Sequence, residues 1–119
     1  MIIAVDFDGT IVEHRYPKIG KELPFAIDTI KAFQKKQFRI ILWTYRAGKE
    51  LDEAIAFCKK RGVEFYAVNK NYPEEQYDES ISRKINADIY IDDRNIGGLP
   101  EWGEIYHMLC PDEPGQRKQ

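Results

Sequence analysis

The sequence predicts an α/β protein built on a parallel sheet, and three observations lead to this prediction. Short apolar runs rich in β-branched residues alternate along the chain with segments whose apolar residues recur at helical spacing. Such alternation is typical of βαβ units, whose strands are parallel. The chain has 119 residues, of which 43% are hydrophobic and 32% charged, enough for one core but not for two. We therefore expect one domain over residues 1–110 and a polar, mobile tail over residues 111–119.

The first half of the chain contains two expected strands and one expected helix. Residues 2–6 are an apolar run that predicts a strand, and residues 9–22 are polar and predict a loop or flap. Pro24 suits the first position of a helix, and the spacing that follows predicts a helix over residues 24–36. The run 38–44 is apolar and β-branched, which predicts a strand buried on both faces.

The second half continues the alternation. Apolar residues between 51 and 58 lie on one stripe of an expected second helix, and Gly62 suits its end. Residues 63–69 predict the third strand, and residues 70–78 predict a loop. Residues 78–86 predict a short helix that leads to the fourth strand.

The last expected elements are a strand over residues 88–92 and a helix over residues 100–109. Right-handed crossovers make successive parallel strands step in one direction until the order reverses. We expect the strand order 3-2-1-4, numbered along the chain, with a crevice between the first and fourth strands. Ligands bind in such a crevice, outside the carboxyl ends of the strands.

Composition and charge exclude several function classes. The net charge of -2 predicts no general attraction to nucleic acid or to acidic membranes. No apolar run approaches the roughly 20 residues that span a bilayer. The start of the chain lacks the basic segment and cleavage site of a signal peptide. Cys58 and Cys110 have no motif spacing, so we expect reduced thiols in a cytoplasmic protein.

Carboxylates gather at the expected carboxyl ends of the first and fourth strands. Asp6 and Asp8 follow the first strand in AVDFDGTI, and along an extended strand they would share a face. Asp92 and Asp93 follow the fourth strand in IYIDDRN, about 4.8 Å away if the two strands are neighbours. Convergent carboxylates repel each other unless a cation compensates them. Mg²⁺ is the expected cofactor, since it prefers carboxylate, water and phosphate oxygens as ligands.

Each piece also has an ordinary structural explanation. A turn accounts for DFDGT alone, and a turn or helix cap accounts for IDDRN alone. Thr44, at the end of the second strand, offers a hydroxyl to a phosphate oxygen but also suits a helix cap. Lys84 precedes Asp92 by eight positions on the expected short helix and is positioned to reach the crevice, although most lysines are solvated. Lys70, after the third strand, is the competing lysine.

Four motifs of this sequence resemble those of the haloacid dehalogenase (HAD) superfamily of phosphotransferases. They are Asp6-Phe7-Asp8-Gly9-Thr10, Thr44, Lys84 and Asp92-Asp93, and they follow in the superfamily's order within residues 2–95. The resemblance implies a Rossmann-like, HAD-like three-layer sandwich. It also implies a Mg²⁺-dependent hydrolase of phosphate monoesters that acts through an aspartyl-phosphate.

The resemblance further implies a role for each residue. Asp6 is the expected nucleophile, and Asp8 is the expected general acid for the leaving group and then the base for water. Thr44, Lys84 and the backbone N–H groups of Phe7 and Asp8 are expected to hold the phosphoryl group. The implied Mg²⁺ ligands are Asp6, Asp8 through its backbone carbonyl, and Asp92, with Asp93 assisting.

The chain departs from many HAD proteins in having no room for a cap domain. The segments that would hold one, residues 9–22 and 70–87, are each too short for a domain. We expect an open site covered by a small flap, as in members that act on large substrates or are closed by a neighbouring subunit. The expected substrate is a phosphorylated small molecule or macromolecule end, and a homo-oligomer would cover the site. Expected contacts to the leaving group are His14, Arg15, Tyr16, Lys18 and Arg46.

Three other interpretations were weighed against this one. A cysteine phosphatase loop is excluded, because Cys110 and Arg117 are one residue further apart than such loops require. A receiver domain is disfavoured, because its acceptor aspartate follows the third strand, where this chain has Val68-Asn69. The remaining alternative is a catalytically silent module that binds a phosphorylated partner. The presence of both Asp6 and Asp8 argues against it, since a silent module needs no acid or base.

Overall fold

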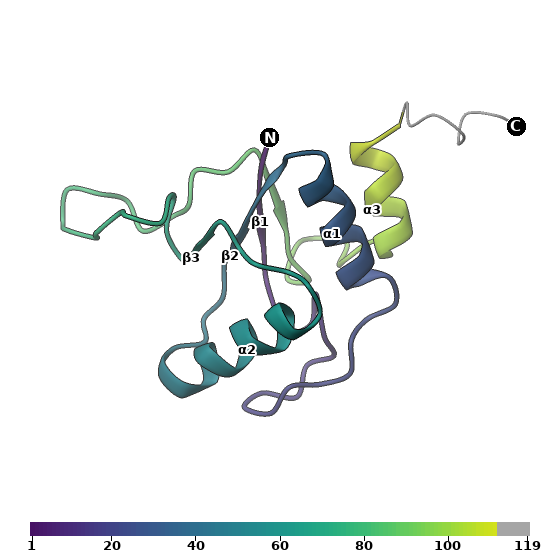
Figure 1. Cartoon of the computed structure of the whole chain (residues 1–119), viewed down its shortest axis with the longest axis horizontal. Coiled ribbons are helices and arrows are strands. Elements are labelled where there is room, and N and C mark those ends of the chain that lie inside the picture. Colours follow the sequence, from purple (N-terminus) through teal and green to yellow (C-terminus); the bar gives the residue numbers. More distant parts are fainter. Residues whose placement is uncertain (112–119) are drawn as a thin grey trace, which may run out of the picture.

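The computed structural model describes residues 1–111 and contains one four-stranded parallel sheet of order β3-β2-β1-β4 (Figure 1). The expected α/β class and strand order are confirmed, and the described residues include no cap domain. Residues 112–119 of the expected tail lie outside the described residues. The elements in chain order are β1 (Ile2–Val5), α1 (Ala26–Lys35), β2 (Arg39–Leu42), α2 (Gly48–Lys60), β3 (Ala67–Val68), β4 (Ile89–Ile91) and α3 (Trp102–Leu109).

The register of the sheet brings three strand ends to one edge. Val5, the last residue of β1, pairs with Leu42 of β2 on one side and with Ile91 of β4 on the other. The residues that follow these positions therefore leave the sheet side by side. This edge is the carboxyl edge at which ligands of parallel sheets bind.

The three helices pack on one face of the sheet. Phe33 of α1, Cys58 of α2 and Trp102 of α3 all belong to one buried cluster with the strand residues Ile3 and Val5. Helices α1 and α3 lie side by side (Figure 1). Right-handed crossovers explain the placement of α1 and α2, because the steps from β1 to β2 to β3 run in one direction and put their helices on one face.

On the opposite face of the sheet, Ile85 and Ala87 of the segment that returns the chain from β3 to β4 pack against the strands. This return steps in the other direction, so a right-handed crossover takes it over the other face. Ile85 of this segment is buried against Ala4, Ile41 and Ala67. The layers are therefore helices, sheet and an irregular crossover segment.

The prediction of a helix over residues 78–86 is wrong, since turns and bends occupy this segment. Side chains compete here for the backbone groups that a helix would use. The Asp78 carboxylate accepts hydrogen bonds from the backbone and hydroxyl of Ser80, and the Ser82 hydroxyl accepts one from the backbone of Lys84. A nine-residue helix is also too short to be stable without tertiary packing of one face, and Ile85 alone is fully buried.

The prediction that Pro24 is the first residue of helix α1 is wrong, because this helix begins at Ala26. Phe25 separates them in a left-handed conformation with φ of 66°, which ends the preceding turn before the helix starts. The Glu22 carboxylate accepts a hydrogen bond from the backbone of Ile27 at 3.3 Å, and so satisfies one of the N–H groups of the first turn. In residues 1–111, no helix has the length and apolar character needed to cross a membrane.

Candidate active site

Three carboxylates meet at the carboxyl edge of the sheet. Asp6 follows β1, and Asp92 and Asp93 follow β4. One oxygen from each of them lies within 4.8 Å of the other two. Asp6 is only 8% exposed, while the other two are half-buried. The pairing of β1 with β4 produces this cluster, as expected from the strand order.

Gly9 and Thr10 hold Asp93 against Asp6. The Thr10 hydroxyl accepts a hydrogen bond from the Asp93 backbone at 3.0 Å and lies 3.3 Å from Asp6 Oδ2. A Cβ atom on Gly9 would lie 2.3 Å from Asp93 Oδ2, and Gly9 has a φ of +83°. Trp102 of α3 holds this turn in place, because its indole N–H donates to the Thr10 carbonyl at 2.8 Å.

Electrostatics at Asp6 reflect this crowding. Burial, together with the charges of Asp92 and Asp93 and a hydrogen bond with Asp93, raises the pKa of Asp6 to about 7. A hydrogen bond with the backbone of Phe7 partly offsets this rise. The Phe7 side chain itself is buried in the core, where its ring meets Phe57 edge-on. A bound cation would reverse the rise in the pKa of Asp6, since it favours the ionised carboxylate.

The Asp8 carboxylate does not join the cluster, contrary to the expectation that it would share a face with Asp6. The alternation of an extended strand ends with β1 at Val5, and Asp8 instead forms a bridge with Val12 around the Gly9 turn. Its carboxylate makes a bidentate ion pair with Arg46, at 2.7 Å and 2.8 Å. The sequence pattern carries no signal for this pair, whose partners are 38 positions apart.

Arg46 is a structural residue in this arrangement, and it is not free to contact a leaving group as expected. Its side chain is buried, with the residue 1% exposed. All five guanidinium N–H donors are engaged. Besides Asp8, they reach the carbonyls of Pro17, Lys18 and Glu50. The hydrogen bond with Asp8 raises the pKa of the guanidinium above its ordinary value. Arg46 thus joins Asp8 to the flap and to α2.

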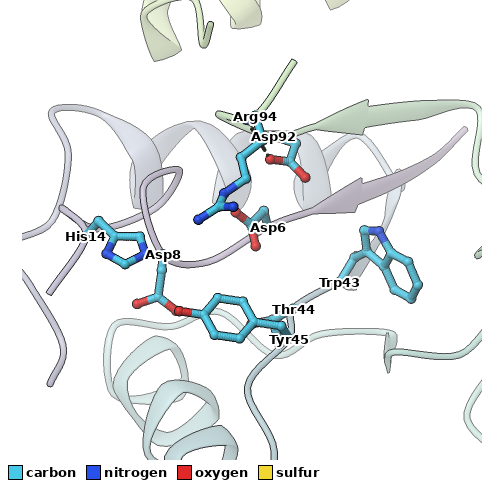
Figure 2. Close-up of a pocket in the computed structure, with 8 residues that line it drawn as sticks. All are labelled: Asp6, Asp8, His14, Trp43, Thr44, Tyr45, Asp92 and Arg94. Atoms are coloured by element: carbon cyan, nitrogen blue, oxygen red, sulfur yellow. Dashed lines mark hydrogen bonds between the residues drawn. The ribbon is translucent and has the colours of Figure 1, made fainter. Parts of the chain in front are cut away.

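The cluster opens into a cavity of about 650 Å³ (Figure 2). His14 of the flap lines it, as expected, whereas Arg15 is exposed on the flap and pairs with Glu13 at 3.6 Å. The lining residues are Asp6, Asp8, His14, Trp43, Thr44, Tyr45, Asp92 and Arg94.

Thr44 lies beside Asp6 on the neighbouring strand end, as expected. Its backbone N–H donates to Asn69 Oδ1 at 2.8 Å, and its hydroxyl accepts from the Arg46 backbone at 3.1 Å. These bonds hold Thr44 in place, and they leave its hydroxyl proton for an acceptor in the cavity. Asn69, with a φ of 55°, was not expected at the site, although its position after β3 is a strand end like the others.

Neither candidate lysine lines the cavity around Asp6. The Lys84 ammonium lies over the Tyr90 ring, 5.2 Å from its centre, and within residues 1–111 it forms no ion pair or hydrogen bond with Asp6. Lys84 does not reach the crevice because the helix expected over residues 78–86, which would direct it there, does not form. Lys70 lines a second cavity of about 310 Å³, which shares Trp43 and Thr44 with the first.

Comparison with known proteins adds one relative. A solved structure of a conserved protein from Bacteroides thetaiotaomicron is 59% identical to this chain, with a TM-score of 0.89. The match covers 95% of this chain and 92% of that protein. The chain belongs to the family of that conserved protein. No protein-family model and no curated protein matches it.

Three residues that line the cavity were not expected from the sequence. Arg94 is the arginine that lines the cavity, and it directly follows the two aspartates of IDDRN. Trp43 and Tyr45 flank Thr44 and therefore also lie at the carboxyl edge. Their adjacency to recognised motif residues was a usable signal, but only the cavity distinguishes them from ordinary loop residues.

Proposed function

We propose that this protein is a Mg²⁺-dependent phosphomonoester hydrolase that acts through an aspartyl-phosphate on Asp6. The observation that carries the proposal is the cluster of Asp6, Asp92 and Asp93, whose oxygens lie within 4.8 Å at the base of an open cavity. Carboxylates this close, one of them buried, are costly without a cation. The four motifs that resemble those of HAD phosphotransferases support the same reaction.

The donor set fits Mg²⁺, because it consists of carboxylate oxygens from rigid strand ends. Asp6, Asp92 and Asp93 would hold the ion. When bound, it supplies positive charge that screens these carboxylates and a phosphate oxygen. Among the described residues, Arg46 is the one buried basic side chain, and its donors are all engaged elsewhere.

The residues of the chain divide the proposed chemistry as follows. The Asp6 carboxylate attacks the phosphorus, a bond from Asp6 to phosphorus forms, and the bond to the leaving oxygen breaks while that oxygen takes a proton from Asp8. The Thr44 hydroxyl and the Arg94 guanidinium stabilise the charge on the remaining phosphate oxygens. Water then attacks the phosphorus and releases phosphate from Asp6, while Asp8 accepts its proton.

Arg46 pairs with both oxygens of the Asp8 carboxyl group. Donation of a proton to the leaving oxygen first requires the ion pair to open. This observation favours the second candidate function, a catalytically silent module that binds a phosphorylated partner through the same cavity.

Phosphate release separates the two candidates. The purified protein is expected to release phosphate from p-nitrophenyl phosphate when Mg²⁺ is present and to stop when the metal is chelated. Asp6→Asn should abolish turnover, because the amide is not a nucleophile. The exposed carboxylate Asp52 on α2 provides the matched control, and Asp52→Asn should keep full turnover. Phosphate binding without turnover in the wild type would support the silent module instead.

Two further proposals accompany the hydrolase. Cys58 and Cys110 are buried thiols, which is the cysteine state expected in the cytoplasm, the proposed compartment. The cavity has no covering domain in the described residues, and a homo-oligomer in which a neighbouring subunit covers it is the proposed assembly. Sedimentation of the purified protein tests this assembly, and a monomer at micromolar concentration would contradict it.

A further inference from the structure

The candidate cavity has two sides that differ in their side chains. Trp43, Thr44 and Tyr45 are consecutive, and their side chains alternate in direction. Figure 2 shows the Tyr45 ring extending toward Asp8 and the Trp43 ring extending away on the other side of Thr44. Tyr45 therefore belongs to the Asp8 side of the cavity, and Trp43 to the opposite side.

The leaving group of a phosphate ester would occupy the Asp8 side. This step depends on the proposed function, in which Asp6 attacks the phosphorus and Asp8 exchanges protons with the departing oxygen and then with water. A proton-transfer partner must lie within hydrogen-bond reach of the atom it serves. The group attached to the leaving oxygen therefore lies next to Asp8 and against Tyr45.

Tyr45 is an exposed aromatic side chain that is nevertheless held in position. It is 58% exposed, and its ring meets that of Tyr16 edge-to-face, with the ring centres 5.0 Å apart. Tyr16 in turn packs over the Arg46 guanidinium at 5.1 Å. Because Arg46 is fixed by its five hydrogen bonds, these contacts restrict the Tyr45 ring before any ligand binds. Preorganised rings bind flat partners at a low cost in conformational entropy.

We propose that Tyr45 stacks on a flat aromatic ring in the leaving group, so that the preferred substrates are small phosphate monoesters that carry such a ring. Nucleoside monophosphates and aryl phosphates both have this chemistry. The cavity volume of about 650 Å³ is sufficient for a ligand of that size. Desolvation near the cavity, followed by the charge of Asp8, raises the pKa of the Tyr45 phenol, so the ring remains neutral at physiological pH.

Binding measured without turnover tests the proposal independently of hydrolysis. In the Asp6→Asn variant with Mg²⁺, calorimetry compares adenosine 5′-monophosphate, phenyl phosphate and ribose 5-phosphate. We expect both ring ligands to bind about tenfold more tightly than ribose 5-phosphate, the size of effect typical of base–aromatic stacking. A second substitution, Tyr45→Ala, should remove this preference, whereas Tyr45→Phe should keep it because the ring remains. Tyr72 is an exposed tyrosine outside both cavities, and Tyr72→Ala should also keep it.

The outcomes separate this inference from the proposed hydrolase. Tighter binding of adenosine 5′-monophosphate than of phenyl phosphate identifies a nucleobase as the ring, and the reverse order identifies a simple aryl group. Equal binding of all three ligands, no binding of any, or a preference that survives Tyr45→Ala overturns the ring site. A ring preference that depends on Tyr45, with no phosphate release by the wild type, retains the ring site and rejects the hydrolase.

Discussion

Gly9 is a position in the candidate site at which an added side chain would meet both backbone strain and a steric clash. Its φ of +83° disfavours any side chain, and an added Cβ would lie 2.3 Å from Asp93 Oδ2. We expect Gly9→Ala to lower the free energy of unfolding by about 1–3 kcal/mol and to displace Asp93. Because Asp93 belongs to the carboxylate cluster, the stabilisation by Mg²⁺ should also weaken. Thermal melts with and without Mg²⁺ measure both effects.

Gly97 is the matched control for Gly9. Its φ of +91° is similar, but an added Cβ would meet nothing within 4 Å. Gly97→Ala should therefore carry the backbone strain alone and keep the full response to Mg²⁺. Equal losses of the Mg²⁺ response in the two variants would mean that the contact between Gly9 and Asp93 has no role at the site.

Also at the residue scale, Arg94 and Lys84 are the two candidates for binding the phosphate of the proposed substrate. Lys84 is the residue implied by the sequence motifs, whereas Arg94 lines the cavity in the structure. We expect Arg94→Ala to lower kcat/KM for phosphate release at least about tenfold, or about 1.4 kcal/mol in the barrier. Lys84→Ala should lower it less, since that ammonium lies over Tyr90. A larger loss in Lys84→Ala would support the motif and would require the segment 78–86 to move toward the cavity.

At the scale of elements, Arg46 connects the flap and α2 to the turn after β1. Arg46→Met removes hydrogen bonds to Pro17, Lys18 and Glu50 and leaves the buried Asp8 carboxylate without its partner. Breaking a buried pair in this way typically costs about 3–5 kcal/mol. We expect a loss of that size in urea unfolding, together with faster hydrogen exchange of flap amides such as that of Glu13, which donates to Lys21.

Arg61 provides the comparison for Arg46. It is a partly exposed arginine on the C-terminal side of α2, and its contact with Glu22 is 3.9 Å long. Surface pairs of this kind contribute about 0–1 kcal/mol, so Arg61→Met should change stability little and leave flap exchange unaltered. Unchanged flap exchange in Arg46→Met would show that the flap is held by other contacts.

At the scale of the whole molecule, Asp6 links stability to pH and, through the proposed metal site, is expected to link it to Mg²⁺. Its pKa is raised from 3.8 to about 7 in the folded chain, so the folded state binds more protons than the unfolded state between these values. This contribution to stability is fully present below the unfolded pKa and is lost as the pH rises through 7. The contribution of Asp6 should therefore give the metal-free protein a lower Tm at pH 8 than at pH 5.

Mg²⁺ should act in the opposite direction, because the proposed site would bind it only in the folded state with the carboxylates ionised. The rise in Tm on adding Mg²⁺ is expected to be larger at pH 8 than at pH 5. Asp6→Asn should remove most of the pH dependence below pH 8, since its amide does not titrate. If the melts with and without Mg²⁺ coincide at pH 8, the three carboxylates do not form a metal site.

The sequence by itself determined the class of fold, the strand order and the edge at which the polar residues gather. Each of these depends on local pattern and on general rules of chain geometry. Apolar runs of residues such as Ile40 and Ile41 specify buried strands, handed crossovers restrict their order, and the carboxylates that end the first and fourth strands favour 3-2-1-4. That order makes Asp6 and Asp92 neighbours, which is why half of the candidate site follows from sequence.

Only the tertiary structure decided which side chains complete the site. The Asp8 pair with Arg46 joins residues 38 positions apart, and the turn at Gly9 breaks the strand alternation on which the expectation for Asp8 rested. The segment 78–86 likewise follows contacts between side chains and backbone together with the burial of Ile85, rather than helical spacing. These features depend on distances between segments, which a local pattern does not specify, because packing energy exceeds the small propensities that the pattern records.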